Sequence, residues 1–263
     1  MQIAEVCRRY QAGETTTRLA KEFDVSFVAI CGLLERRHIA RREQALCQRR
    51  HICNHAFFSS IDTEEKAYWL GFIAADGYIS WAKDGNSALT VTLAPQDKEH
   101  LYRLQNSLQS THPVKEYNYP YKQLVKLFIR SKQLTDDLAS YGVVPAKTFT
   151  HSWPQLPDDL LIHFLRGYVD GDGGFHVTVD NRYPGTWGYT FEITSNKPFL
   201  ESCQQFLMRM CDLSQTKFDQ RRSATSIFTL RYSGRRQVAR IGKMLYEHAT
   251  IYLPRKHDIA TSL

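Results

Sequence analysis

Two stretches of this 263-residue chain share one pattern, and the duplication constrains the fold more than any other feature. The first runs from Tyr68 to Gly77 (YWLGFIAADG) and the second from Phe164 to Gly173 (FLRGYVDGDG). Each is a run of bulky, mostly apolar residues that ends in Asp-Gly. This pattern is typical of a short buried helix that ends at a glycine. The duplication predicts a chain that contains two copies of one structural unit.

Small residues recur four positions apart within each stretch, at Gly71 and Ala75 and at Gly167 and Gly171. Residues four apart lie on one face of a helix. Because such a face carries no large side chains, two helices can approach through it until their backbones nearly touch. We therefore predict that the two helices pack against each other at Gly71 and Gly167.

This packing would place Asp76 and Asp172 side by side at the C-terminal ends of the two helices. Two carboxylates repel at short range, and each also lies at the negative end of a helix dipole. A divalent cation with oxygen ligands relieves both penalties. The pattern therefore predicts a metal site. The alternative is a duplicated packing unit without chemistry.

Residues 69–77 and 165–173 resemble the two motifs of single-chain LAGLIDADG homing endonucleases. The two acids are 96 residues apart, which is domain spacing. The resemblance implies an α+β fold with duplicated αββαββα repeats about a pseudo-two-fold axis and saddle-shaped antiparallel sheets. It also implies a monomer that cuts both strands of double-stranded DNA at a long asymmetric site.

The resemblance implies Mg²⁺ as the cofactor, with Asp76 and Asp172 as metal ligands. The backbone carbonyls of Ala75 and Gly171 would also face the ions. Paired Mg²⁺ ions can activate a water molecule and stabilise the phosphate and the leaving oxygen. One cut per strand across the minor groove would leave staggered 3′ overhangs. Ala74 stands where the second stretch has Asp170, but this first acidic position is not the metal ligand.

The family also places a lysine near each active site, after the second strand pair of each repeat. Lys147 and Lys256 occupy matching places here, where their charge could organise water or stabilise the transition state. A polar residue that positions water lies where the second strand gives way to a helix. Aligning the repeats through Leu108 and Leu207 assigns this role to Gln96 and Ser195.

The chain is basic and has no feature of a secreted or membrane protein. Its 34 Lys and Arg residues exceed its 27 Asp and Glu residues, which favours a polyanionic partner such as nucleic acid. The six cysteines have no disulfide-like spacing, and the N-terminus lacks the apolar core of a signal peptide. We therefore expect an intracellular protein. The longest apolar run is far shorter than the roughly 20 residues that cross a bilayer.

Residues 1–45 are predicted to form a small all-helical domain with helices near residues 3–10, 15–23 and 27–37. The segment from Leu19 to Ser26 (LAKEFDVS) resembles the helix-turn-helix of the resolvase class. The resemblance implies that the third helix lies in the major groove of DNA, with Ser26 and Phe27 at its start.

The outward positions expected on this third helix are Phe27, Val28, Cys31 and Gly32. They lack the paired hydrogen-bonding groups with which Arg, Asn and Gln recognise bases. We therefore expect the domain to add affinity through phosphate contacts. The residues expected to make them are Arg36, Arg37, Arg41 and Arg42. The alternative is a helical module that serves only for packing.

A basic linker over residues 46–62 is predicted to connect this domain to the repeats, which cover residues 63–152 and 153–263. In each repeat, helical and alternating patterns predict the order helix, two strands, helix, two strands, helix. The last predicted helix covers residues 235–247. Along the strand at residues 122–130, apolar residues alternate with cationic and aromatic ones, so one face can present cations to DNA. The sheet residues expected to contact DNA are Lys126, Arg130, Lys217, Arg221 and Arg231.

Two other functions are compatible with this fold. One is a catalytically silent DNA-binding regulator, against which the presence of both acids and both lysines argues. The other is an intron-splicing maturase that binds its host intron RNA, because a basic saddle can also hold structured RNA.

The unequal lengths of Gln96 and Ser195 predict that the two strands are cut at different rates. The shorter serine cannot reach as far, so the two sites should not position water equally well. A plasmid time course would reveal the difference as accumulation of a nicked intermediate. Equal rates for the two strands would refute this prediction.

Overall fold

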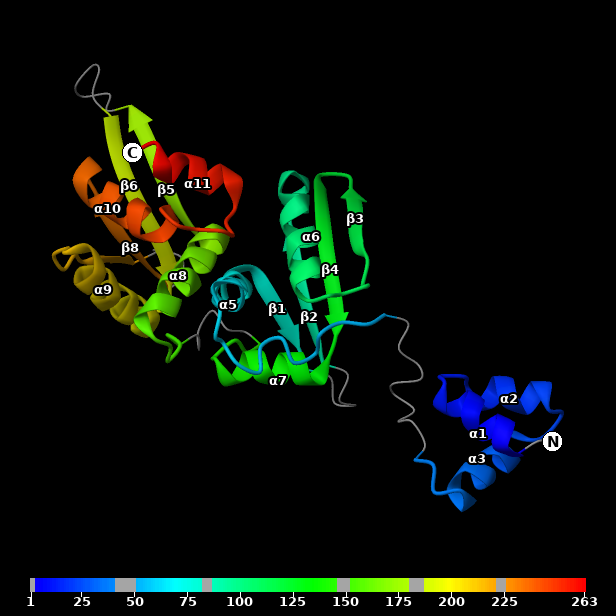
Figure 1. Cartoon of the computed structure of the whole chain (residues 1–263). Coiled ribbons are helices and arrows are strands. Elements are labelled where there is room, and N and C mark those ends of the chain that lie inside the picture. The colour runs from blue at the N-terminus through cyan, green and yellow to red at the C-terminus, as the bar shows by residue number, and fades with distance from the viewer. Residues whose placement is uncertain (1–2, 41–50, 82–86, 146–151, 180–186, 221–225) are drawn as a thin grey trace. The chain divides into compact units, whose positions relative to one another are not determined.

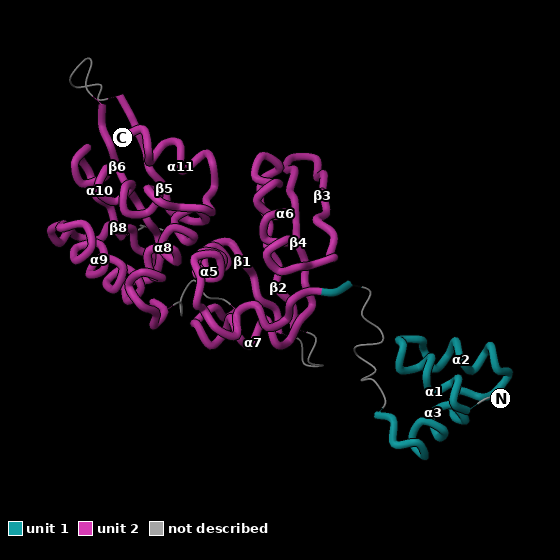
Figure 2. The backbone as a smooth tube through the Cα atoms, viewed as in Figure 1, with its two compact units in different colours: residues 1–52 teal, residues 53–263 magenta. Residues whose placement is uncertain are grey.

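The computed structural model describes residues 3–40, 51–81, 87–145, 152–179, 187–220 and 226–263. Contacts divide the chain into two units, residues 1–52 and residues 53–263 (Figure 2). The division falls within the predicted linker. However, the last part of that linker packs into the second unit, because Phe57, Phe58 and Ile61 are buried in its core. Residues 53–62 are therefore not a linker.

The first unit contains three helices around a small apolar core. They are α1 (Ile3–Gln11), α2 (Thr16–Glu22) and α3 (Phe27–Arg36). The core contains Val6, Leu19, Ile30 and Leu34, which are fully buried. The predicted outward position of Cys31 is wrong, because its side chain is only 8% exposed. It lies next to Ile30, at the border of the apolar face.

The first repeat of the second unit has the predicted order of elements, with an additional 3₁₀ turn before its second helix (Figure 1). Its elements are α5 (Glu64–Asp76), β1 (Gly77–Ser80), β2 (Ala88–Leu93), η1 (Pro95–Asp97), α6 (Lys98–Ser107), β3 (Val114–Tyr119), β4 (Lys122–Arg130) and α7 (Lys132–Ser140). The strands form an antiparallel sheet in the order β1-β2-β4-β3.

The second repeat has the same topology. Its elements are α8 (Asp158–Asp172), β5 (Gly173–Val179), β6 (Trp187–Ser195), α9 (Lys197–Cys211), β7 (Phe218–Gln220), β8 (Phe228–Ser233), α10 (Arg235–Tyr246) and α11 (Pro254–Thr261). Its antiparallel sheet has the order β5-β6-β8-β7. The predicted α+β fold with duplicated repeats is therefore confirmed. Helix α11 was not predicted, although Pro254 at its first position is a typical helix start.

Helices α5 and α8 pack side by side between the two repeats (Figure 1). A Cβ atom at Gly71 would overlap the carbonyl oxygen of Phe164, and one at Gly167 would overlap that of Tyr68. Both glycines therefore permit contact between the two backbones. Every residue from Ala67 to Ala75 is buried, so α5 is enclosed on all sides.

Replacing Gly71 with alanine should destabilise the second unit by about 3 kcal/mol, because the new methyl group meets backbone atoms that cannot rotate away. Urea denaturation of the full chain would measure the loss. Gly32→Ala on α3 is the control, since its nearest neighbour would be an Arg36 side-chain atom at 4.0 Å. An unchanged unfolding midpoint of the second unit in Gly71→Ala would contradict the close packing.

Candidate functional site

The C-terminal ends of α5 and α8 carry Asp76 and Asp172, and each helix continues directly into the first strand of its sheet. The two ends lie close together, because Asp76 Oδ2 is 3.4 Å from the position that a Cβ atom on Gly171 would take. Asp76 is half-buried and Asp172 is exposed. The paired ends therefore present two carboxylates at one place, one of which faces solvent.

Lys256, in the first turn of α11, lies at the same place and is buried. Its ammonium group donates hydrogen bonds to the carbonyl oxygens of Val169 (2.8 Å), Gly171 (3.0 Å) and Gly173 (2.8 Å). Burial disfavours the charged form and lowers the pKa of Lys256 to about 8, while the nearby carboxylates of Asp170, Asp76 and Asp172 oppose this shift. A cation thus caps the negative end of α8 beside both acids.

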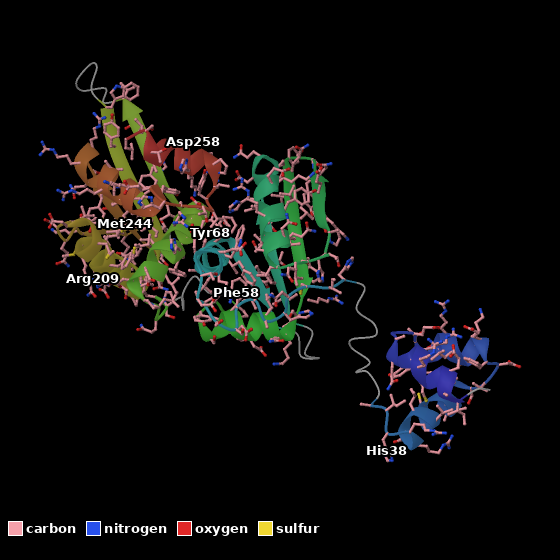
Figure 3. The ribbon with its side chains drawn as sticks, in the orientation of Figure 1. His38, Phe58, Tyr68, Arg209, Met244 and Asp258 are labelled. Atoms are coloured by element: carbon pink, nitrogen blue, oxygen red, sulfur yellow. The ribbon has the colours of Figure 1, made fainter. Side chains whose placement is uncertain are left out.

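Asp170 is the centre of a buried hydrogen-bond network. Its side chain is 1% exposed and accepts hydrogen bonds from Tyr68 Oη (2.8 Å), Tyr246 Oη (2.6 Å) and the backbone N–H of Leu253 (2.7 Å). Desolvation raises the pKa of this carboxyl group, and the three donors oppose the rise. Figure 3 labels Tyr68, which joins α5 to this network.

Tyr68 Oη also lies 2.8 Å from His100 Nε2 of α6. Burial of the imidazole lowers the pKa of His100 to about 3, so His100 is neutral near pH 7. The network therefore joins four helices, α5, α6, α8 and α10, and links His100 of the first repeat to Asp170 of the second through Tyr68.

Arg166 forms a second buried contact between the repeats. Its guanidinium is 1% exposed and donates to Glu64 of α5 (2.5 Å) and to the carbonyl oxygens of Ile251 and Leu245 (both 2.9 Å). Sequence reasoning did not assign a role to Arg166. The sequence does contain a signal for such a role, because an arginine in an apolar helix is buried only where hydrogen-bond or charge partners satisfy it.

Ser195 lies at the end of β6, where its Oγ accepts a hydrogen bond from Tyr168 Oη at 3.1 Å. Gln96 is exposed and lies in the 3₁₀ turn η1. If the two repeats are aligned by the residues that begin their second helices, Asp97 and Asn196, then Gln96 corresponds to Ser195, as in the sequence alignment. If the repeats are aligned by the pairing of their first two strands, Ser195 corresponds to Leu93 instead, because the first repeat contains the additional turn. The two residues therefore lie in different local structures.

The predicted DNA-binding cations of the two sheets have different partners. In the first sheet, Lys126 lies over the ring of Tyr117 and Arg130 over that of Phe128. In the second, Arg231 donates to Asp219 (2.7 Å) and Glu192 (3.1 Å). Aromatic rings leave a cation its net charge, whereas two carboxylates cancel it.

The remaining predicted DNA contacts lie at exposed positions or outside the described residues. Ser26, Phe27, Arg36, Arg37 and Lys217 are exposed. Ser26 also begins α3, since its Oγ accepts from the N–H of Ala29 at 3.1 Å. The predicted site residues outside the described part of the chain are Arg41, Arg42, Lys147 and Arg221.

Comparisons with known proteins agree with this geometry. A model of the LAGLIDADG-like domain matches residues 63–139. The LAGLIDADG meganuclease I-AabMI bound to uncleaved DNA is similar at 15% identity, with coverage of 73% of this chain and 86% of that one and a TM-score of 0.50. The chain has the fold of LAGLIDADG homing endonucleases.

Two other solved structures share this fold. The meganuclease I-SmaMI bound to uncleavable DNA has 13% identity and a TM-score of 0.51, with coverage of 76% of this chain and 87% of that one. The LAGLIDADG homing endonuclease I-GzeII in complex with its DNA target has 11% identity and a TM-score of 0.50, with coverage of 73% and 87%. The search of curated proteins gives no match.

The donors at the paired helix ends of this LAGLIDADG fold suit a hard divalent cation. Carboxylate and carbonyl oxygens are the ligands that Mg²⁺ prefers. Within the described ranges, no group of three or more His, Cys, Asp or Glu side chains could hold a metal ion. Two carboxylates fit Mg²⁺, which is commonly bound by one or two carboxylates together with water and substrate phosphates.

Among the described residues, no helix has the length and apolar character to cross a membrane.

Proposed function

We propose that this protein is a site-specific homing endonuclease that hydrolyses both strands of double-stranded DNA at a long asymmetric site with Mg²⁺. The observation that carries the proposal is the meeting of Asp76, Asp172 and the Lys256 ammonium at the paired ends of α5 and α8. Structures with this fold include enzymes bound to DNA. Both motif helices belong to one chain, so a monomer suffices.

The metal ligands in this proposal are Asp76 and Asp172, together with the backbone carbonyls of Ala75 and Gly171. When bound, Mg²⁺ lowers the pKa of water and stabilises the charge on the phosphate and on the leaving oxygen. The carbonyl oxygen of Gly171 already accepts from Lys256 and has a second lone pair for a further contact. One cut on each strand across the minor groove would leave staggered 3′ overhangs.

The chain's own cations and hydroxyl groups would complete the site. The Lys256 ammonium, held at the end of α8, would lie near the negative charge that develops on the phosphate, and preorganised charge of this kind stabilises a transition state. Lys147 would serve the other strand. Ser195 and Gln96 would position water. Because Ser195 Oγ accepts from Tyr168, its own proton is directed to another acceptor.

DNA would lie along the exposed faces of the two sheets. Lys126 and Arg130 of the first sheet, which pack on aromatic rings, would face this side, and Lys217 and Arg221 would add donors from the second. The N-terminal helices would act as a helix-turn-helix module that holds phosphates through Arg36 and its neighbours.

Cleavage of a randomised double-stranded DNA library with Mg²⁺, followed by sequencing of the ends, tests the proposed activity. Wild-type protein should cut a long asymmetric site with 3′ overhangs. Asp76→Asn and Asp172→Asn should each reduce cutting at least about a hundredfold, because each removes a metal-binding charge. Asp158→Asn, at the opposite end of α8, is the matched control and should cut like the wild type. Binding of the library without any cut by the wild type would contradict the proposal and favour a silent regulator or a maturase.

Lys126→Ala should weaken DNA binding more than Arg231→Ala. The charge of Arg231 is already compensated by Glu192 and Asp219, whereas Lys126 packs on an aromatic ring. In fluorescence anisotropy titrations at several salt concentrations, Lys126→Ala should reduce the salt slope by about 1. The Arg231 variant should leave that slope unchanged. The reverse order of effects would contradict this account of the sheet faces.

A further inference from the structure

Asp170 lies two residues before Asp172 but points into the protein, away from the paired acids. Its Oδ2 accepts the backbone N–H of Leu253 at 2.7 Å. Leu253 is the residue immediately before α11, which begins at Pro254. The carboxylate therefore binds the start of this helix directly, across 83 residues of chain.

The same helix start carries Lys256, three residues after Leu253. Its buried ammonium donates to three carbonyl oxygens at the end of α8. A short helix of this length has little stability of its own, so tertiary contacts decide where it lies. The position of the ammonium therefore depends on what fixes the first turn of α11.

A residue of the first repeat makes a second contact with this first turn of α11. The Arg255 guanidinium donates to the buried Asp97 carboxylate, with Nη2 3.1 Å from Oδ2. Arg255 is about half exposed at its side chain, so solvent screens this pair. The fully buried hydrogen bond from Leu253 to Asp170 is the stronger restraint.

The first repeat has no equivalent of this acid. Ala74 occupies the matching position on α5 and is 2% exposed. A methyl group accepts no hydrogen bond, so position 74 of α5 cannot bind a helix start in this way. The restraint on the lysine is therefore a property of the second repeat.

We propose that Asp170 is a positioning residue that docks the start of α11 and thereby holds the Lys256 ammonium against the end of α8. Its consequence for catalysis rests on the proposed endonuclease function, whereas the docking itself does not. Loss of Asp170 should release the lysine and impair the cut that depends on Lys256.

Reductive methylation of the native full-length protein, read out by peptide mass spectrometry, tests the docking without DNA. In wild type, Lys256 should react slowly because its amine is buried and fully hydrogen-bonded. Asp170→Ala should increase its labelling rate by about tenfold, the effect expected when a charged hydrogen bond to a backbone N–H is lost. The exposed Lys243 is the internal reference and should react equally in all variants.

Two further variants separate docking from general damage. Tyr246→Phe removes another hydrogen bond to Asp170, at 2.6 Å, but leaves the bond to Leu253 intact, so Lys256 should stay protected. Asp170→Leu has nearly the same side-chain shape but accepts no hydrogen bond, so it should increase labelling in the same direction as Asp170→Ala. It decides the test if Asp170→Ala does not fold. A folded Asp170 variant with wild-type protection of Lys256 would overturn the proposal.

Strand-resolved single-turnover cleavage tests the catalytic consequence. Asp170→Leu should slow the same strand as Lys256→Met, while DNA affinity and cutting of the other strand stay near wild type. Equal slowing of both strands would overturn the positioning role and indicate general damage. If the wild type cuts neither strand, the endonuclease proposal fails, and the labelling result still decides whether Asp170 docks Lys256.

Discussion

The contact between the backbones of α5 and α8 at Gly71 and Gly167 determines where every other part of the site lies. It joins the apolar interiors of the two repeats into one core. It also brings together two helix ends with like partial charges and two carboxylates. That arrangement is unfavourable without compensation, since the charges repel. The buried Lys256 ammonium compensates part of this negative charge from within the protein. The remaining carboxylate and carbonyl oxygens at the two helix ends suit a divalent cation.

Buried polar groups fix the orientation of these helices, but they do so differently in the two repeats. Arg166 and Asp170 are almost fully buried, and their desolvation is offset by several hydrogen bonds to both repeats. Packing of glycines permits close approach but allows the helices to slide, whereas directional hydrogen bonds select one arrangement. Both groups belong to α8, and Ala74 leaves α5 without a matching acid. The 3₁₀ turn η1 and the compensated charges of the second sheet add to this asymmetry. A duplicated fold thus carries two sites with different supports.

The regular elements and the paired acids could be predicted from the sequence because their signals are local. The strand at residues 122–130 was predicted at its observed bounds, since alternation along a half-buried strand is a strong pattern. The role of Asp170 could not be predicted, because its partners come from residues far along the chain. Helix α11 is only eight residues long and has no apolar periodicity of its own. The packing of residues 53–62 was missed because this segment has two adjacent phenylalanines but no regular apolar pattern.

The central claim is that both helix ends form one metal site, and iron-directed cleavage of the polypeptide tests it most directly. Fe²⁺ would replace Mg²⁺ in the protein bound to DNA, and ascorbate with peroxide would generate radicals that cut nearby backbone. The account predicts cuts near both Asp76 and Asp172, which excess Mg²⁺ suppresses and which either single Asp→Asn substitution removes together. Cuts near one helix end alone, or cuts that survive both substitutions, would contradict it.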